Sequence, residues 1–243
     1  MIDRVSQAAR PRAVAIGYQS WRDLLFLHWP VPVAALRPLV PASLEIDVHE
    51  GTAYVGLVPF AMQGVRFIGT PRALALAFLE TNVRTYVHVE GRDPGVYFFS
   101  LDAASRLAVH AARASFGLPY HAARMSLRRD GAAIDYALRR AGPRRPSLAV
   151  RYEPLEPLGP SQPGTLDHFL IERYLLHVER AGRLWTGQVN HRPYPCRRVR
   201  VERLEEDLVA AAGLTRPPGP APIAHYSPGV DVEIFAPWPR RRG

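Results

Sequence analysis

The segment Phe78–Val89, FLETNVRTYVHV, combines the alternation of a β-strand with side chains that can do chemistry. Residues two apart on a strand face the same way at about 6.6 Å, so Glu80, Asn82 and Arg84 share one face. A glutamate in a partly apolar site has a raised pKa and can act as a general acid or base. An arginine can bind a carboxylate through two parallel hydrogen bonds. If this face lines a cavity, Arg84 could hold an anionic ligand there.

The periodicity alone leaves the surroundings of this face open. Glu80 and Arg84 lie about 13 Å apart along the strand, too far for a direct ion pair. On an exposed face both charges are simply hydrated. In an interior each needs a partner from a neighbouring element, because an unpaired buried charge is very costly. The opposite face, with Thr81 and Thr85, suits either core packing or solvent, so the pattern fits both arrangements equally.

Further polar candidates lie in other segments. His28 stands in the apolar run FLHWP, and Tyr120 and His121 follow a predicted helix end in GLPYH. Each has an ordinary structural interpretation, such as a hydrogen-bonded core histidine. Glu172 and Arg173 can be interpreted in the same ordinary way, as a salt bridge on a helix surface. Asn190 and His191 lie in a predicted turn, where an asparagine commonly caps the backbone.

Established catalytic signatures are missing from the sequence. There is no nucleophile elbow, P-loop, dinucleotide fingerprint or paired-histidine metalloprotease helix. The nine histidines show no metal-ligand spacing, so we predict neither a metal site nor a cofactor. Cys196 is the single cysteine, which excludes an intrachain disulfide and a cysteine-based zinc site. Its neighbours Arg197 and Arg198 could lower the thiol pKa, but we favour a structural or incidental cysteine.

The basic charge consists of arginine alone. The chain has 31 Lys plus Arg and 22 Asp plus Glu, hence 31 − 22 = +9, and it contains no lysine. A polyanionic partner is one interpretation. The arginines are dispersed, and no nucleic-acid-binding signature accompanies their small clusters, which are Arg139–Arg145, Arg197–Arg203 and Arg240–Arg242. We favour GC-rich codon usage as the cause and predict no nucleic-acid partner.

The bulk composition is typical of a soluble globular protein, with 47% hydrophobic and 22% charged residues in 243. The first residues, MIDRVSQAARPR, lack the apolar core of a signal peptide. The apolar run Ala73–Leu79 is too short to span a bilayer. We therefore predict a cytoplasmic protein without a membrane partner.

The element pattern predicts an α+β fold built on one large antiparallel sheet or barrel. Residues 44–48 and 53–62 indicate a hairpin, and 78–89 and 96–102 indicate a second. A third turns at Asp130–Gly131. The predicted helices are 32–39, 103–116, one from an N-cap at Thr165 to Gly182, and 204–212, and the remaining strands are 183–191, 197–202 and 230–235.

An ordered series of motifs resembles the YqjF-like family of uncharacterised bacterial proteins. The motifs are LLFLHWPVP, LRPLVPASLEID, AYVGLVPFAM, LETNVRTYV, VYFFSLDA, FGLPYHAARM, GTLDHFLIERY and NHRPYP. That family is similar in fold to acetoacetate decarboxylase, whose antiparallel sheet curls into a cone around an interior site. The resemblance implies an α+β acetoacetate decarboxylase-like β cone or barrel with a few peripheral helices. It implies one domain over 1–243, with a core at about 21–235.

The resemblance also implies a site, with one departure. The Glu80 face would line the cone, and the decarboxylases carry an active-site glutamate at the matching position. Their Schiff-base lysine falls at or next to Tyr120 and His121. This chain has no lysine, and arginine stays protonated, so the iminium mechanism is excluded.

The remaining expectation is an interior cavity for a small, anionic or carbonyl-bearing metabolite. We assign Glu80, Tyr120 and His121 as catalytic, in a lyase- or dehydratase-type enzyme without Schiff-base chemistry. The ligand-binding residues would be Arg84, Asn82 and His28. The alternative is a non-catalytic small-molecule-binding protein of the same fold. A homo-oligomer is compatible with either function.

Overall fold

The computed structural model describes residues 2–105, 109, 117–215 and 222–240. Thirteen strands form one sheet in the order β13-β10-β9-β5-β6-β7-β8-β11-β12-β1-β3-β4-β2. The strands are β1 (Gly17–Val31), β2 (Glu45–Ile46), β3 (Ala53–Phe67), β4 (Leu76–Val89), β5 (Arg92–Ala103), β6 (Tyr120–Asp130), β7 (Ala133–Arg140), β8 (Ser147–Gly159), β9 (Leu175–Arg180), β10 (Arg183–Asn190), β11 (Cys196–Glu206), β12 (Ile223–Ile234) and β13 (Trp238–Pro239).

Among the described residues the helices are few and short. They are α1 (Val33–Leu36), α3 (Leu166–Ile171) and α4 (Leu208–Ala211), with 3-10 turns η1 (Ser6–Ala8), η2 (Arg37–Leu39) and η3 (Arg72–Leu74). Within the described part of the chain, no helix is both long and apolar enough to cross a membrane. The largely antiparallel, curled sheet with few helices confirms the predicted α+β cone-like fold class. Two pairings, β5–β6 and β5–β9, are parallel.

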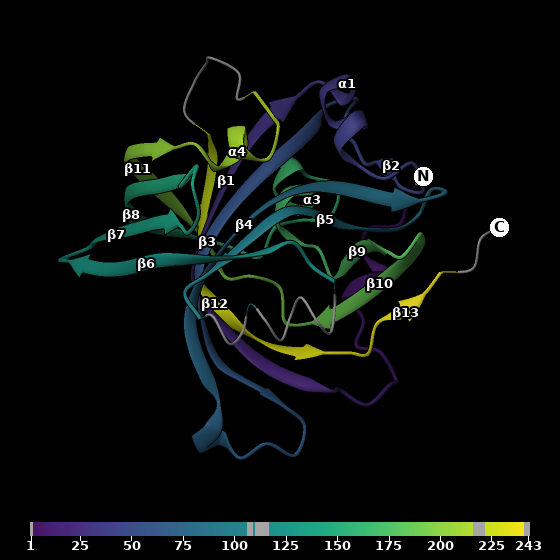
Figure 1. Cartoon of the computed structure of the whole chain (residues 1–243), viewed down its shortest axis with the longest axis horizontal. Coiled ribbons are helices and arrows are strands. Elements are labelled where there is room, and N and C mark those ends of the chain that lie inside the picture. The colour runs from purple at the N-terminus through teal and green to yellow at the C-terminus, as the bar shows by residue number, and fades with distance from the viewer. Residues whose placement is uncertain (1, 106–108, 110–116, 216–221, 241–243) are drawn as a thin grey trace.

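The sheet closes on itself twice, because β4 also pairs with β5 and β10 also pairs with β12. One ring runs through β5, β6, β7, β8, β11 and β12, and the other through β5, β9, β10 and β12. Strands β1, β3 and β4 belong to both rings and form a shared wall. Figure 1 shows β6, β7, β8 and β11 on one side of this wall and β9 and β10 on the other.

Each ring encloses its own apolar cluster. The first interior holds Leu27, Leu57 and Val83 from the wall together with Tyr136 and Tyr152. The second interior holds further wall residues and all of the apolar side of α3, whose residues pack inside the ring rather than on its outside. These side chains are Phe26, Val58, Phe60, Tyr86, Phe169, Leu170 and Ile171. Alternate residues of one wall strand therefore enter two different interiors, because successive side chains point to opposite faces.

Several predicted elements are confirmed. Strand β4 covers the predicted 78–89 and forms the predicted hairpin with β5. The hairpin at Asp130–Gly131 joins β6 to β7. Thr165 is the N-cap of α3, since its Oγ1 accepts a hydrogen bond from the His168 amide at 3.3 Å.

Other predicted elements are wrong, and the cause is pairing between distant segments. The segment around Glu45–Ile46 pairs with β4 and not with β3, because β1 and β4 flank β3 on both sides. Helix α3 ends at Ile171. The rest of the predicted 165–182 helix contains strand β9, which pairs with β5 and β10. Most of the predicted 204–212 helix is strand or cap, leaving only α4. Of the predicted helix 103–116, residues 106–108 and 110–116 lie outside the described residues, and Ala103 ends β5.

The contact between β1 and β12 depends on one glycine. Gly229 stands opposite Arg22 with φ of +134°, and a Cβ there would lie 2.1 Å from the Trp21 carbonyl oxygen. We expect Gly229→Ala to lower the free energy of unfolding by more than about 3 kcal/mol, because the strands would have to separate. Gly131→Ala is the control: its φ is +59°, but nothing lies within 4 Å, so about 1–2 kcal/mol is expected. Urea unfolding measures both values, and equal losses would contradict the close-approach argument.

Candidate functional site

Glu80 and Tyr120, two of the predicted catalytic residues, meet inside the molecule. Glu80 lies on β4 opposite Ala103, and Tyr120 begins β6 beside Leu101, so both flank β5. The Tyr120 hydroxyl donates a hydrogen bond to Glu80 Oε2 at 2.8 Å. The two residues are only 3% and 8% exposed. This contact joins two residues that are forty positions apart in the sequence.

Burial dominates the electrostatics of this pair. It raises the pKa of Glu80 from 4.5 to about 7, although the Tyr120 hydrogen bond works in the opposite direction; the charge of Asp102 adds to the rise. Burial, and then the charge of Glu80, holds the pKa of Tyr120 well above 10. Near neutral pH Glu80 is thus balanced between acid and base, while Tyr120 keeps its proton. A carboxyl group with such a pKa is suited to moving protons.

The first interior fixes the backbone of Glu80 from behind. The Tyr136 hydroxyl donates to the Glu80 carbonyl oxygen at 2.9 Å and lies 3.0 Å from Thr81 Oγ1. Asp102, which is fully buried, receives two hydrogen bonds from Arg140 at 2.6 and 2.7 Å. A bidentate pair of this kind is strong and directional. The wall segment that carries Glu80 is therefore held from the interior that Glu80 does not face.

His121, the third predicted catalytic residue, lies apart from this pair. It stands beside Asp102 in the parallel β5–β6 pairing, whereas Tyr120 stands beside Leu101. Since neighbouring side chains of a strand point to opposite faces, His121 lies on the face away from Glu80. The structure brings Glu80 and Tyr120 together but not His121.

His28 and Arg84 form a second group around the C-terminal end of α3. His28 Nε2 lies 2.8 Å from the Tyr86 hydroxyl, which donates to the Leu170 carbonyl oxygen at 2.6 Å. Arg84 Nη2 donates to the same carbonyl at 3.2 Å. Burial, and next the charge of Arg84, lowers the pKa of His28 well below 6.5, so the ring is neutral. Gly56 leaves room for the group, because a Cβ there would lie 3.0 Å from the His28 ring.

Asn82 lies between the two groups on β4 and is buried. Among the described residues, its Oδ1 has no hydrogen-bond partner, and the same is true of Arg84 Nε and His28 Nδ1. Buried polar atoms normally have partners, so each such atom calls for an explanation. The Glu80 face of β4 thus presents an acid–base pair, an amide oxygen and a guanidinium nitrogen to the second interior.

Glu172 and Arg173 belong to this interior too, which the sequence analysis missed. Both were interpreted as a salt bridge on a helix surface, but α3 ends before them and both are buried. Glu172 accepts hydrogen bonds from the Tyr174 hydroxyl at 2.7 Å and the Tyr194 amide at 2.9 Å, and burial raises its pKa. Arg173 instead lies 3.2 Å from Asp47. The flanking apolar residues of HFLIERYLL were the one available signal of burial.

Cys196 is not activated as a thiolate. Burial, followed by the charges of Glu172 and Asp167, raises the pKa of Cys196 to about 12. The lowering that Arg197 and Arg198 could have caused is therefore outweighed, and the thiol stays protonated. Across the part of the chain that is described, no three His, Cys, Asp or Glu side chains gather as metal ligands.

The pKa of Glu80 links protonation to stability. Its value is 4.5 in an unfolded chain and about 7 in the fold, so between these values only the folded chain keeps the proton. The free energy of unfolding should therefore fall by about 3 kcal/mol as pH rises through this window. We expect Glu80→Gln to abolish this component. Urea unfolding gives the free energy of unfolding of wild type and of Glu80→Gln at about pH 5 and about pH 8, and the difference between the two proteins should change between these pH values. A wild-type minus variant difference that does not change with pH would rule out the raised pKa.

The fold of this chain also occurs in proteins of known structure. Solved structures with the same fold include the enduracididine biosynthesis enzyme MppR in complex with pyruvate (TM-score 0.65, 13% identity, 96% of this chain and 94% of that one). An acetoacetate decarboxylase-like enzyme from Sphingomonas wittichii RW1 is also similar (TM-score 0.61, 12% identity, 95% of each chain). Likeness at this identity shows the fold alone. It confirms the predicted acetoacetate decarboxylase-like architecture.

Closer relatives define the family. The uncharacterized protein YqjF of Bacillus subtilis (strain 168) is 38% identical over 233 residues, which cover 96% of this chain and 94% of that protein. The family DUF2071, described as an uncharacterized conserved protein, matches residues 18–231. The chain therefore belongs to the DUF2071 family, as a relative of YqjF with the fold of the acetoacetate decarboxylases.

Proposed function

We propose that this protein is an enzyme that moves protons on a small carbonyl-bearing, anionic metabolite without a covalent intermediate. The observation that carries the proposal is the buried hydrogen bond of 2.8 Å between Tyr120 and Glu80, with the pKa of Glu80 raised to about 7. A pKa near the working pH gives a general base the best balance between availability and strength. Structural neighbours support the substrate class, since MppR has been solved with pyruvate, a carbonyl compound with a carboxylate.

The chemistry assigned to the pair is enolisation. The Glu80 carboxylate takes a proton from the carbon next to the carbonyl group, and the electron pair of that C–H bond moves toward the carbonyl oxygen. Tyr120, which keeps its proton, turns its hydroxyl to donate a hydrogen bond to this oxygen. Glu80 then returns the proton, either to carbon or to a hydroxyl group on the adjacent carbon. In the second case the C–O bond of that hydroxyl group breaks, a C=C bond forms from the enolate electrons, and the C=O bond reforms. The first outcome is an isomerisation or exchange and the second is a dehydration.

The substrate carboxylate is assigned to Arg84, and a hydrogen-bond donor of the substrate is assigned to Asn82. Arg84 Nε and Asn82 Oδ1 are buried on the same face as Glu80 and lack partners among the described residues. A carboxylate can accept from the guanidinium, and a protonated or hydroxyl-bearing group can donate to the amide oxygen. The absence of lysine keeps the reaction non-covalent, because no side-chain amine is present to attack the carbonyl carbon.

A non-catalytic binding protein is the second candidate function. It is favoured by the packing of α3, because Leu170 already accepts hydrogen bonds from both Arg84 and Tyr86. A ligand bound near Arg84 would then be held without reaching Glu80. The two functions differ in whether a bound carbonyl compound loses a proton.

Proton exchange with solvent distinguishes the two functions. A panel of 2-oxo acids and 3-oxo acids is incubated with the protein in deuterated water, and deuterium uptake next to the carbonyl is followed by NMR. We expect enzyme-dependent uptake that falls about 100-fold or more in Glu80→Gln. Tyr120→Phe should lose a similar factor, because it removes the donor to the oxyanion.

Glu45→Gln is the matched control. It replaces a glutamate by glutamine as Glu80→Gln does, but Glu45 is exposed on β2 and lies outside the interior. Its rate of deuterium uptake should equal that of wild type. Full activity in Glu80→Gln would exclude Glu80 as the base. A ligand-induced rise in melting temperature without any uptake would favour the binding protein.

A further inference from the structure

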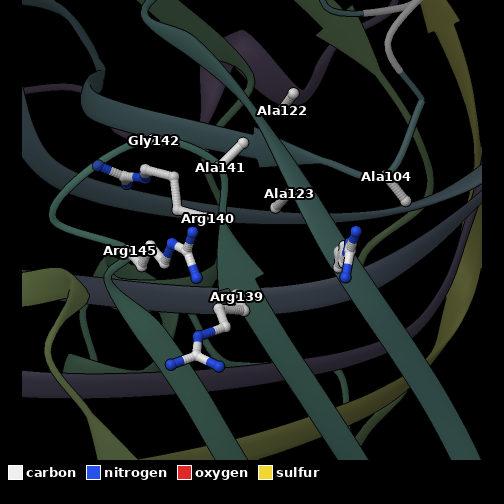
Figure 2. A pocket seen from close by; sticks show the side chains of 9 residues that line it. Ala104, Ala122, Ala123, Arg139, Arg140, Ala141, Gly142 and Arg145 are labelled. Atoms are coloured by element: carbon white, nitrogen blue, oxygen red, sulfur yellow. The ribbon is translucent and has the colours of Figure 1, made fainter.

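A cavity of about 550 Å³ lies outside the Glu80 site, at the open end of the β6–β7 hairpin, where β6 begins and β7 ends. It lies next to the point where the pairing between β5 and β6 ends, and residues that follow β7 form part of its lining. Its lining consists of Ala104, Ala122, Ala123, Arg124, Arg139, Arg140, Ala141, Gly142 and Arg145. In Figure 2, Arg139, Arg140 and Arg145 gather around it from the end of β7 and the turn that follows. The lining thus combines four arginines with small apolar residues.

Within the part of the chain that is described, three of the four arginines lack an acidic partner. Arg124 stands directly opposite Arg139 in the antiparallel β6–β7 pair, and like charges in this position repel each other. Arg145 adds a third charge from a turn position with φ of +44°. Within the described residues none of these three makes an ion pair, whereas Arg140 is fully engaged by Asp102 and Ser100.

On the neighbouring surface, the positive charge of an arginine is compensated by acidic side chains. Arg151 on β8 contacts Asp130, Asp135 and Glu202, so its charge is neutralised within the sheet. At the cavity the same sheet leaves three guanidinium groups facing one hollow without compensation. A bound anion would supply the missing negative charge and remove the repulsion between Arg124 and Arg139.

We propose that this cavity binds a small multivalent anion of the phosphate type, such as a phosphate ester or a pyrophosphate. Guanidinium groups match phosphate oxygens through paired hydrogen bonds, and three of them from separate segments suit a group with more than one negative charge. The alanines accommodate an apolar remainder of the ligand. The volume lies within the usual range for small-molecule sites, about 300–1,000 Å³.

Calorimetric titration of the whole chain with inorganic pyrophosphate, in phosphate-free buffer of low ionic strength, tests the site. Saturable binding is expected, and Arg124→Ser or Arg139→Ser should each weaken it about tenfold or more, because a charge-assisted contact is lost. Arg128→Ser is the matched control. Arg128 is exposed on the same face of β6 but lies outside the cavity, so its removal should change the affinity less than about twofold.

Thermal unfolding gives a second readout that does not depend on heats of binding. Without pyrophosphate, Arg139→Ser should melt no lower than wild type, because it relieves repulsion between exposed charges. With pyrophosphate, wild type and Arg128→Ser should gain stability, and Arg139→Ser should not.

Four outcomes would overturn the proposal. The first is the absence of both heat and stabilisation at millimolar pyrophosphate. The second is equal weakening by Arg128→Ser, which would indicate diffuse attraction. The third is tighter binding of succinate, which would assign the cavity to dicarboxylates. The fourth is tighter binding of a single-stranded oligonucleotide that also depends on Arg128, which would indicate a polymer-binding surface.

Discussion

The structure depends on a wall of three strands, β1, β3 and β4, that is buried on both faces. Because the sheet branches at β5 and β12, this wall separates two interiors instead of separating one core from solvent. Every residue of its central part must therefore pack or find a partner, since neither face is open to water. The charged face of β4 is a direct result: Glu80 and Arg84 are buried and must be satisfied by other elements.

This constraint also produces the chemistry of the candidate site. A carboxyl group in such a wall loses its hydration, which raises its pKa, and a single hydrogen bond from Tyr120 does not restore what burial removes. The opposite interior supplies rigidity through Tyr136 and the Asp102–Arg140 pair. Precise positioning thus comes from one interior and the reactive atoms face the other. Such preorganisation is what a proton-transfer site requires.

The sequence allowed local features to be predicted and concealed those that depend on distant pairing. Strand β4, its hairpin with β5, and the Thr165 cap follow from alternation and turn chemistry within a few residues. The pairing of β2 with β4 and the conversion of Leu175–Arg180 into strand β9 depend on partners far along the chain. For the site, alternation grouped Glu80, Asn82 and Arg84, and the family resemblance suggested Tyr120. The burial of Glu172 and Arg173 was missed. The apolar periodicity predicted a helix that continues through both residues, whereas α3 ends just before them.

The double burial of β4 has a consequence for how this family can vary in length. Odd and even residues of the strand belong to different interiors, so inserting or deleting one residue would exchange them. Glu80 and Arg84 would then enter the apolar cluster around Leu57 and Tyr136, and Val83 would take a place beside Phe169. Substitutions can be absorbed one at a time on either side of the wall. An insertion or deletion within the wall needs a β-bulge to restore the alternation, as at the register shifts already present in β1, β3 and β4, whereas the loop between β3 and β4 can change length without one.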